Sequence, residues 1–147
     1  MKLRAVLLAF GILAALPALA IAGPSAMSPE LGAKLAGKYE TPKGSPTAHG
    51  IVNVTLMSAS GKICWKFDVV GLAKPSAAHI HRGQAGKSGP IVVSLGGAYK
   101  PKGCAKAAKA TIEKISSNPN AYYVNVHTAK YPAGAIRGQL IVGMVHM

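Results

Sequence analysis

A β-hairpin is indicated by residues 50–70, which read GIVNVTLM (50–57), SASG (58–61) and KICWKFDVV (62–70). Apolar and polar residues alternate on both sides of the small residues in the middle, with the period of two that is typical of strands. In the second run, Ile63, Trp65 and Phe67 share one face. The short run 58–61 ends in glycine and is typical of a turn. The stretch therefore predicts two antiparallel strands with one buried face.

The rest of the chain repeats this pattern in short runs. Strands are predicted over residues 31–39, 77–81, 90–95, 122–128 and 135–142. A single helix is predicted over residues 105–117, where an apolar stripe ends at Asn118 and Pro119. We therefore expect an all-β fold with one short helix, arranged as a single antiparallel Greek-key β-sandwich or barrel. A small α+β domain is the alternative.

The first 22 residues are typical of a secretory signal peptide. Lys2 and Arg4 precede an apolar run over residues 5–16, and small residues surround the predicted cleavage site after Ala22. A retained membrane anchor is the alternative, but Pro17 interrupts the apolar run. We expect a signal peptide at 1–22, a short tether at 23–30, a β-domain at 31–147 and a periplasmic or secreted location.

The chain is strongly basic. Its 147 residues include 17 Lys and Arg but only 4 Asp and Glu, for a formal charge of +13, which falls to +11 when Lys2 and Arg4 leave with the signal peptide. Such a surface attracts anionic lipid or polysaccharide of the cell envelope. The sequence contains no basic run interleaved with aromatic residues, so nucleic-acid binding is not expected. Four acids offer no paired-carboxylate site and the sequence lacks a nucleophile elbow, so we expect no enzymatic activity.

Two cysteines, Cys64 and Cys104, stand forty residues apart. In an oxidising compartment an even count of two most simply forms one disulfide. A pair of free thiols or of soft metal ligands is the alternative.

A His-x-His pair lies in the strand predicted at 77–81. In a strand His79 and His81 point to the same face, about 7 Å apart, as two imidazoles must to bind one metal ion. The alternative is a pair of surface or hydrogen-bonded histidines.

Two further predicted strands have polar faces that packing alone does not explain. Tyr123, Asn125 and His127 share one face of the strand at 122–128, and Arg137 and Gln139 share one face of the strand at 135–142. The first face is either solvated or part of a site. Arg137 presents a fork of donors either to a ligand or to loop carbonyls. Because consecutive strands usually pair, the two faces are expected to be neighbours.

These segments resemble the CHRD (chordin) domain family. The matching stretches are AAHIHRG (77–83), GPIVV (89–93), YYVNVHT (122–128) and YPAGAIRGQL (131–140). The resemblance spans residues 31–142 and implies a secreted or periplasmic domain whose biochemical role is generally unassigned. The family often has Glu where this chain has Ala135, so any role of an acid there is lost.

A weaker similarity is to Cu/Zn superoxide dismutase, a Greek-key barrel with a His-x-His pair of copper ligands. The bridging histidine and zinc-binding aspartate of that enzyme have no counterpart here, so dismutase activity is not expected.

Three hypotheses follow for the function. The first is a module that binds copper or zinc through His79, His81 and His127, with Asn125 or Gln139 orienting an imidazole. The second is a structural domain in which the same polar side chains form an internal hydrogen-bond network. The third is an envelope-associated basic domain. The last residues, 143–147, carry Met and His but are expected to be a frayed tail.

Overall fold

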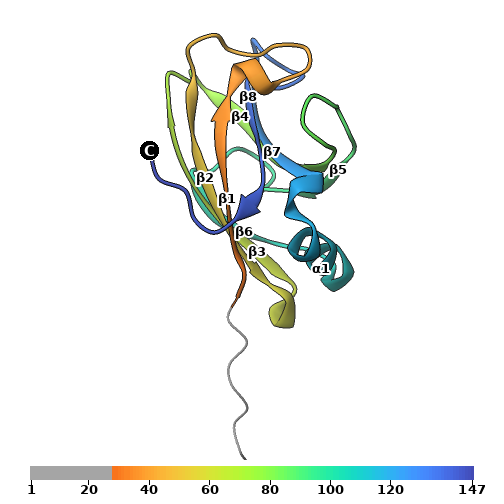
Figure 1. Cartoon of the computed structure of the whole chain (residues 1–147). Helices are drawn as coiled ribbons and strands as arrows, with labels where there is room; N and C mark the ends of the chain where they lie inside the picture. The colour runs from red at the N-terminus through yellow and green to blue at the C-terminus, as the bar shows by residue number, and fades with distance from the viewer. Residues whose placement is uncertain (1–27) are drawn as a thin grey trace, which may run out of the picture.

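The computed structural model describes residues 28–147, which form a mainly β structure with one α-helix (Figure 1). The predicted signal peptide and residues 23–27 of the predicted tether lie outside the described residues. In chain order the elements are β1 (Glu30–Ala36), η1 (Gly37–Tyr39), β2 (His49–Met57), η2 (Ser58–Ser60), β3 (Lys62–Val70), β4 (Pro75–Arg82), β5 (Ile91–Ser94), β6 (Lys102–Lys106), α1 (Lys109–Ser117), η3 (Pro119–Ala121), β7 (Tyr122–Thr128), β8 (Ile136–Gln139) and β9 (Ile141–Val142).

The strands pair antiparallel in the order β5-β4-β7-β8-β1-β2-β3-β6, and β9 pairs with β1. The connection between β5 and β6 joins the two edges of this sheet: the Leu95 amide donates to the Ala78 carbonyl of β4, and the Phe67 amide of β3 donates to the Pro101 carbonyl. The sheet is thereby a nearly closed barrel. The chain crosses between distant strands from β3 to β4 and from β6 to β7. The predicted antiparallel barrel with one helix is confirmed.

The hairpin over residues 50–70 is also confirmed. β2 and β3 pair over their whole length, with Val54 opposite Trp65 and Val52 opposite Phe67. These four side chains point into the core. The η2 turn ends at Gly61, which has φ of 62°. Glycine adopts this left-handed conformation without steric cost.

Several elements differ from the predictions, among them the strand predicted at 135–142, which forms the two strands β8 and β9. The first strand ends at Ala36 rather than at residue 39, because the chain turns at Gly37 against the backbone of Ser45. The helix begins at Lys109 rather than at residue 105. Residues 102–106, KGCAK, form the unpredicted β6, whose Lys-rich sequence lacks an apolar run but which pairs with β3.

The disulfide Cys64–Cys104 is present and links β3 to β6, where the two cysteines stand opposite each other. The predicted pairing is confirmed, and it indicates an oxidising, extracellular type of environment.

Replacing both cysteines with serine is expected to lower the free energy of unfolding by about 2–4 kcal/mol, because the bridge restricts the unfolded chain across a long loop. Chemical denaturation of the double variant Cys64→Ser/Cys104→Ser checks this. The wild type treated with reductant is the control and should lose the same amount. An unchanged denaturation midpoint in both samples would show that the bridge contributes nothing.

Among the described residues, no helix is both long and apolar enough to cross a membrane. The predicted fraying of residues 143–147 is wrong at Val145, which is buried. Its amide donates to the Asn53 side-chain oxygen, and its carbonyl accepts from the Asn53 side-chain nitrogen. Sequence could not show this, because the partner lies on β2.

Candidate metal centre

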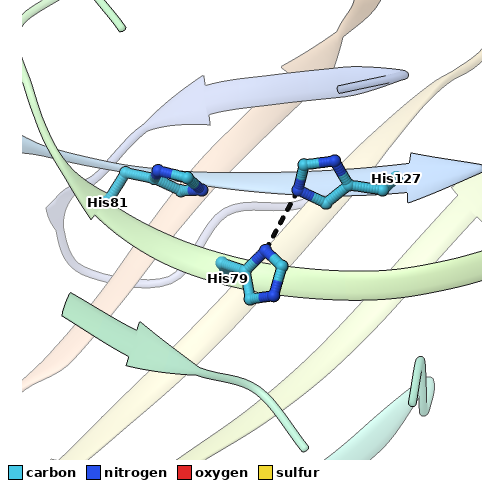
Figure 2. Close-up of side chains that lie close together, drawn as sticks. All are labelled: His79, His81 and His127. Carbon is cyan, nitrogen blue, oxygen red and sulfur yellow. Dashed lines mark hydrogen bonds between the residues drawn. The ribbon is translucent and has the colours of Figure 1, made fainter. Parts of the chain in front are cut away.

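Three histidines meet on the outer face of the barrel where β4 and β7 pair (Figure 2). The register places His79 opposite Asn125, and Ala77 opposite His127. The imidazoles of His79, His81 and His127 each offer a nitrogen, and these three nitrogens lie within 4.8 Å of one another. The structure therefore brings the His-x-His pair and His127 together.

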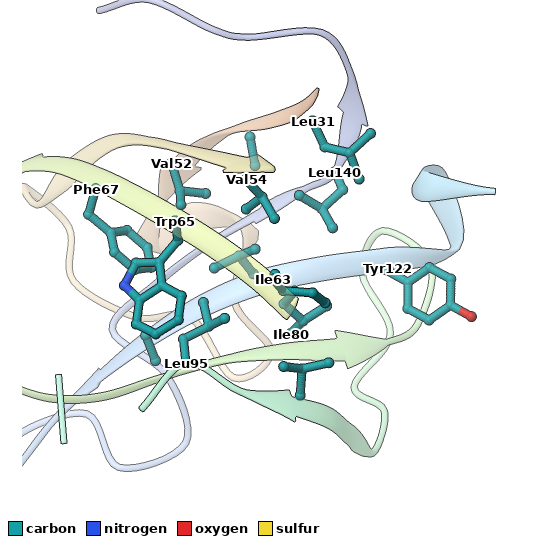
Figure 3. Packing of buried hydrophobic residues seen from close by; sticks show 14 of the residues in the cluster. Leu31, Val52, Val54, Ile63, Trp65, Phe67, Ile80, Leu95, Tyr122 and Leu140 are labelled. Carbon is teal, nitrogen blue, oxygen red and sulfur yellow. The ribbon is translucent and has the colours of Figure 1, made fainter. Parts of the chain in front are cut away.

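The opposite faces of the same strands hold this arrangement in place. Ile80 on β4 and Val124 and Val126 on β7 are fully buried in the core (Figure 3 labels Ile80). A shift of register by one residue would exchange the two faces of a strand and expose these side chains. Burial of the core thus determines that His79, His81 and His127 point outward together.

Backbone carbonyls fix the tautomers of two of the histidines. Nδ1 of His81 lies 2.8 Å from the Gly89 carbonyl oxygen, and Nδ1 of His127 lies 3.0 Å from the Pro132 carbonyl oxygen. A carbonyl only accepts, so in each ring Nδ1 carries the proton. Nε2 of each neutral ring therefore presents a lone pair, as a metal ligand requires.

The lone pair of His127 points at two further polar groups. Its Nε2 lies 3.0 Å from Nδ1 of His79, along the dashed line in Figure 2, and 3.1 Å from Oδ1 of Asn125. Nε2 of His81 is buried and has no hydrogen-bond partner. Acceptor atoms of His81, His127 and Asn125 thus lie close together. A proton or a metal ion bound between them would satisfy these acceptors.

The cluster disfavours protons. Burial, together with the charges that His127 and His81 acquire on protonation, lowers the pKa of His79 from 6.5 to about 4. Burial is also the main cause that lowers the pKa of His81. At neutral pH both rings are neutral and keep their lone pairs.

These shifts predict how the stability of the metal-free protein depends on pH. As pH falls from 6.5 to about 4, the unfolded chain takes up a proton that folded His79 excludes, so folding stability is lost. Glu40 has the opposite effect, because burial raises its pKa from 4.5 to about 7. Between these pH values the folded protein binds a proton at Glu40 that the unfolded chain does not, so this contribution to folding stability increases as pH falls.

Denaturation in a chelator at several pH values tests both contributions. His79→Gln should lose less stability than the wild type on acidification, and Glu40→Gln should lose more. Parallel curves for the three proteins would contradict both assignments.

Next to the histidines, Tyr123 lies between His81 and Arg137. Its ring stacks on the His81 imidazole with centroids 4.8 Å apart, and Cζ of Arg137 lies 3.7 Å from the ring centre. Tyr123 and Asn125 are buried, so the predicted polar face is not a solvated one. The stack fixes the plane of the His81 ring.

Arg137 fulfils one of its two predicted roles. Its Nη2 donates to the carbonyls of Gln84 and Lys87, at 3.2 Å and 3.1 Å, and so holds the loop between β4 and β5 over the sheet. Of the two side chains offered as alternatives for orienting an imidazole, Asn125 places its Oδ1 3.1 Å from Nε2 of His127, whereas Gln139 donates to the carbonyls of Gly83 and Asn120. The register explains this, because Gln139 stands opposite Tyr123 whereas Arg137 stands opposite Asn125.

Sequence reasoning missed three groups that shape this region. The Gly89 and Pro132 carbonyls set the tautomers, and no side-chain pattern reports on carbonyls. Glu40 is buried with only 6% of its surface exposed, although its neighbours Thr41 and Pro42 are exposed. Its position just after the strand predicted at 31–39 gave no sign of burial.

The chain was compared with known proteins. No curated protein and no solved structure matches it. A family model described as CHRD domain matches residues 31–140, a range that includes all three histidines and most of the barrel. That match covers well over half of the chain, and the chain therefore belongs to the CHRD domain family.

Proposed function

We propose that this CHRD domain is an exported, non-enzymatic module that binds one copper or zinc ion through His79, His81 and His127. The observation that carries the proposal is the buried, unpartnered Nε2 of His81, which faces the imidazoles of the other two histidines. A buried acceptor without a donor is uncommon in folded proteins and calls for an explanation. A cation at this point satisfies it.

The spacing suits a metal ion after small movements. Three imidazole nitrogens bound tetrahedrally at about 2.0–2.1 Å from zinc are about 3.3 Å apart. Here one pair is 3.0 Å apart and all three nitrogens lie within 4.8 Å. Modest ring rotations close the set around an ion. His79 would then bind the ion through Nδ1 as the tautomer whose ring proton is on Nε2.

Three neutral imidazoles are borderline ligands, which suit copper and zinc better than calcium or magnesium. His79 and His127 are only half buried, which leaves a side of the site from which an ion enters. The disulfide supports export to the periplasm or the outside, where copper and zinc are taken up without competition from cytosolic thiols.

Metal analysis tests the proposal. The protein is purified without a polyhistidine tag, stripped with chelator, dialysed against Cu(II) or Zn(II) and analysed for retained metal. We expect about one ion per chain, as three protein ligands with an open fourth position define a single site. The triple variant His79→Ala/His81→Ala/His127→Ala is the comparison, and equal retention by both proteins would reject the site.

A structural role for the same residues is the second candidate function. It is favoured by the hydrogen bonds that run from His81 to Gly89, from His127 to Pro132 and from Arg137 to Gln84. These bonds tie two loops to the sheet. If this is their only role, substitution lowers the melting temperature in chelator and added metal leaves the wild-type melting temperature unchanged. The metal proposal instead predicts a rise on addition of metal to the wild type alone.

A further inference from the structure

A cavity of about 780 Å³ lies on the outer face of the barrel, beside β1 and β8. It is lined by residues of β1, η1, the loop after η1, the loop between β4 and β5, β8 and the C-terminal segment. The residues of its wall include the charged Lys34, Lys38, Glu40 and Arg137 and the apolar Tyr39 and Ile141. None of the three histidines is among them, so the cavity is separate from the candidate metal centre.

Two charged side chains of this wall are buried and incompletely satisfied. Arg137 is 2% exposed and Glu40 is 6% exposed. Nη1 of Arg137 and Oε1 of Glu40 have no hydrogen-bond partner, so these two side chains do not pair with each other. Buried polar atoms normally have partners, and leaving a charged one without any is costly. A ligand with polar atoms at this wall would supply what both lack after small side-chain movements that expose these two atoms.

The charges of the wall favour an anion. Lys34, Lys38 and Lys43 are exposed around the cavity and add to the charge of Arg137. Glu40 is the acid of the wall, and burial raises its pKa to about 7, so its negative charge is reduced at neutral pH. Nη2 of Arg137 is already bonded to two carbonyls, which leaves Nη1 and Nε for a ligand. A single guanidinium beside an acid suits a single negative charge better than a double one.

The remaining wall is apolar. Tyr39 and Ile141 are about half exposed, and with Pro42 they offer hydrocarbon surface. A cavity of a few hundred cubic ångströms with apolar walls and a few polar groups is typical of small-molecule sites. We propose that this cavity binds a monoanionic carboxylate that carries an apolar chain or ring, with its charged end toward Arg137 and Glu40. The proposal does not depend on metal binding.

Calorimetric titration with four probes tests the chemistry, in the presence of chelator. Decanoate has both the carboxylate and the chain, acetate has only the carboxylate, decanol has only the chain, and decyltrimethylammonium has the opposite charge. We expect saturable binding of decanoate, with affinity at least about tenfold above that for each of the others. Equal binding of decanoate and the cationic probe, or no saturable binding of decanoate, would overturn the proposal.

Two matched pairs of lysine substitutions test whether decanoate binds at this cavity. Lys34→Ala/Lys38→Ala removes two exposed cations at the cavity, and Lys100→Ala/Lys102→Ala removes two exposed lysines beyond it. Exposed lysines are replaced without loss of the fold, so both variants should remain folded. Decanoate affinity should fall about tenfold in the first and stay within about twofold in the second. An equal fall in both variants would show that decanoate responds to net charge and not to this cavity.

Discussion

His81→Ala should weaken binding of Cu(II) or Zn(II) by more than about 100-fold, since even residues that only orient a metal ligand account for 10–100-fold in affinity. Among the three proposed ligands, His81 is the one whose geometry is most constrained. Gly89 fixes its tautomer, Tyr123 stacks on its ring, and its Nε2 is buried without a partner. Removing the imidazole removes one of three ligands, and a two-histidine remnant does not hold the ion tightly.

The matched control is His49→Ala. His49 lies on β2 and is exposed, and its Nδ1 bonds to the nearby Thr47 carbonyl. It is outside the histidine cluster, so its loss should leave the affinity unchanged. Competition titration with a chromophoric chelator measures both variants. A similar loss in both, or no loss in His81→Ala, would mean that the ion binds elsewhere.

Trp65→Ala should lower the free energy of unfolding by about 3–5 kcal/mol, the usual cost of removing a large buried aromatic side chain. Trp65 packs across Gly103 on β6, where a Cβ would lie 2.8 Å from the indole ring. Its Nε1 donates to the Lys100 carbonyl at 3.0 Å. The side chain thus joins β3 to the connection that closes the barrel.

Trp65→Phe separates the two contributions. It keeps a ring over Gly103 but loses the partly buried hydrogen bond to the Lys100 carbonyl, and loss of that bond should cost about 0.5–1.5 kcal/mol. Urea denaturation followed by circular dichroism measures both variants, since Trp65 is the single tryptophan and fluorescence is lost with it. A cost below about 1 kcal/mol for Trp65→Ala would contradict the packing described for the closure.

Most of the fold could be predicted from the sequence because apolar and polar residues alternate along the strands. In β3 the apolar positions Ile63, Trp65 and Phe67 all reach the core, and in β7 Val124 and Val126 do the same. β6 was missed because KGCAK has almost no apolar side chains. Its place depends on pairing with β3 and on the bond between Cys64 and Cys104, which lie far apart in the chain.

The side chains of the candidate site could be predicted from the sequence, but the backbone carbonyls that orient them could not. His79 and His81 were recognisable from spacing, and His127 from the composition of its strand. The carbonyls that orient them come from loops, where pattern carries no information on direction. Asn125 and Gln139 were alternatives for orienting an imidazole, and only the register separates them, because it places Gln139 opposite Tyr123. Glu40 needed the tertiary structure, since nothing in the sequence around it indicates burial.

The proposed metal centre requires that three particular imidazoles hold one metal ion through particular nitrogens. Long-range nitrogen–proton NMR of the zinc-titrated protein observes this directly, because bound, protonated and free imidazole nitrogens have distinct shifts. Of the five histidines in the chain, we predict that His79, His81 and His127 respond, with Nε2 of His81 and of His127 bound to zinc and Nδ1 of each still protonated. Zinc-dependent shifts confined to His49 or His146, or none at all, would contradict the account.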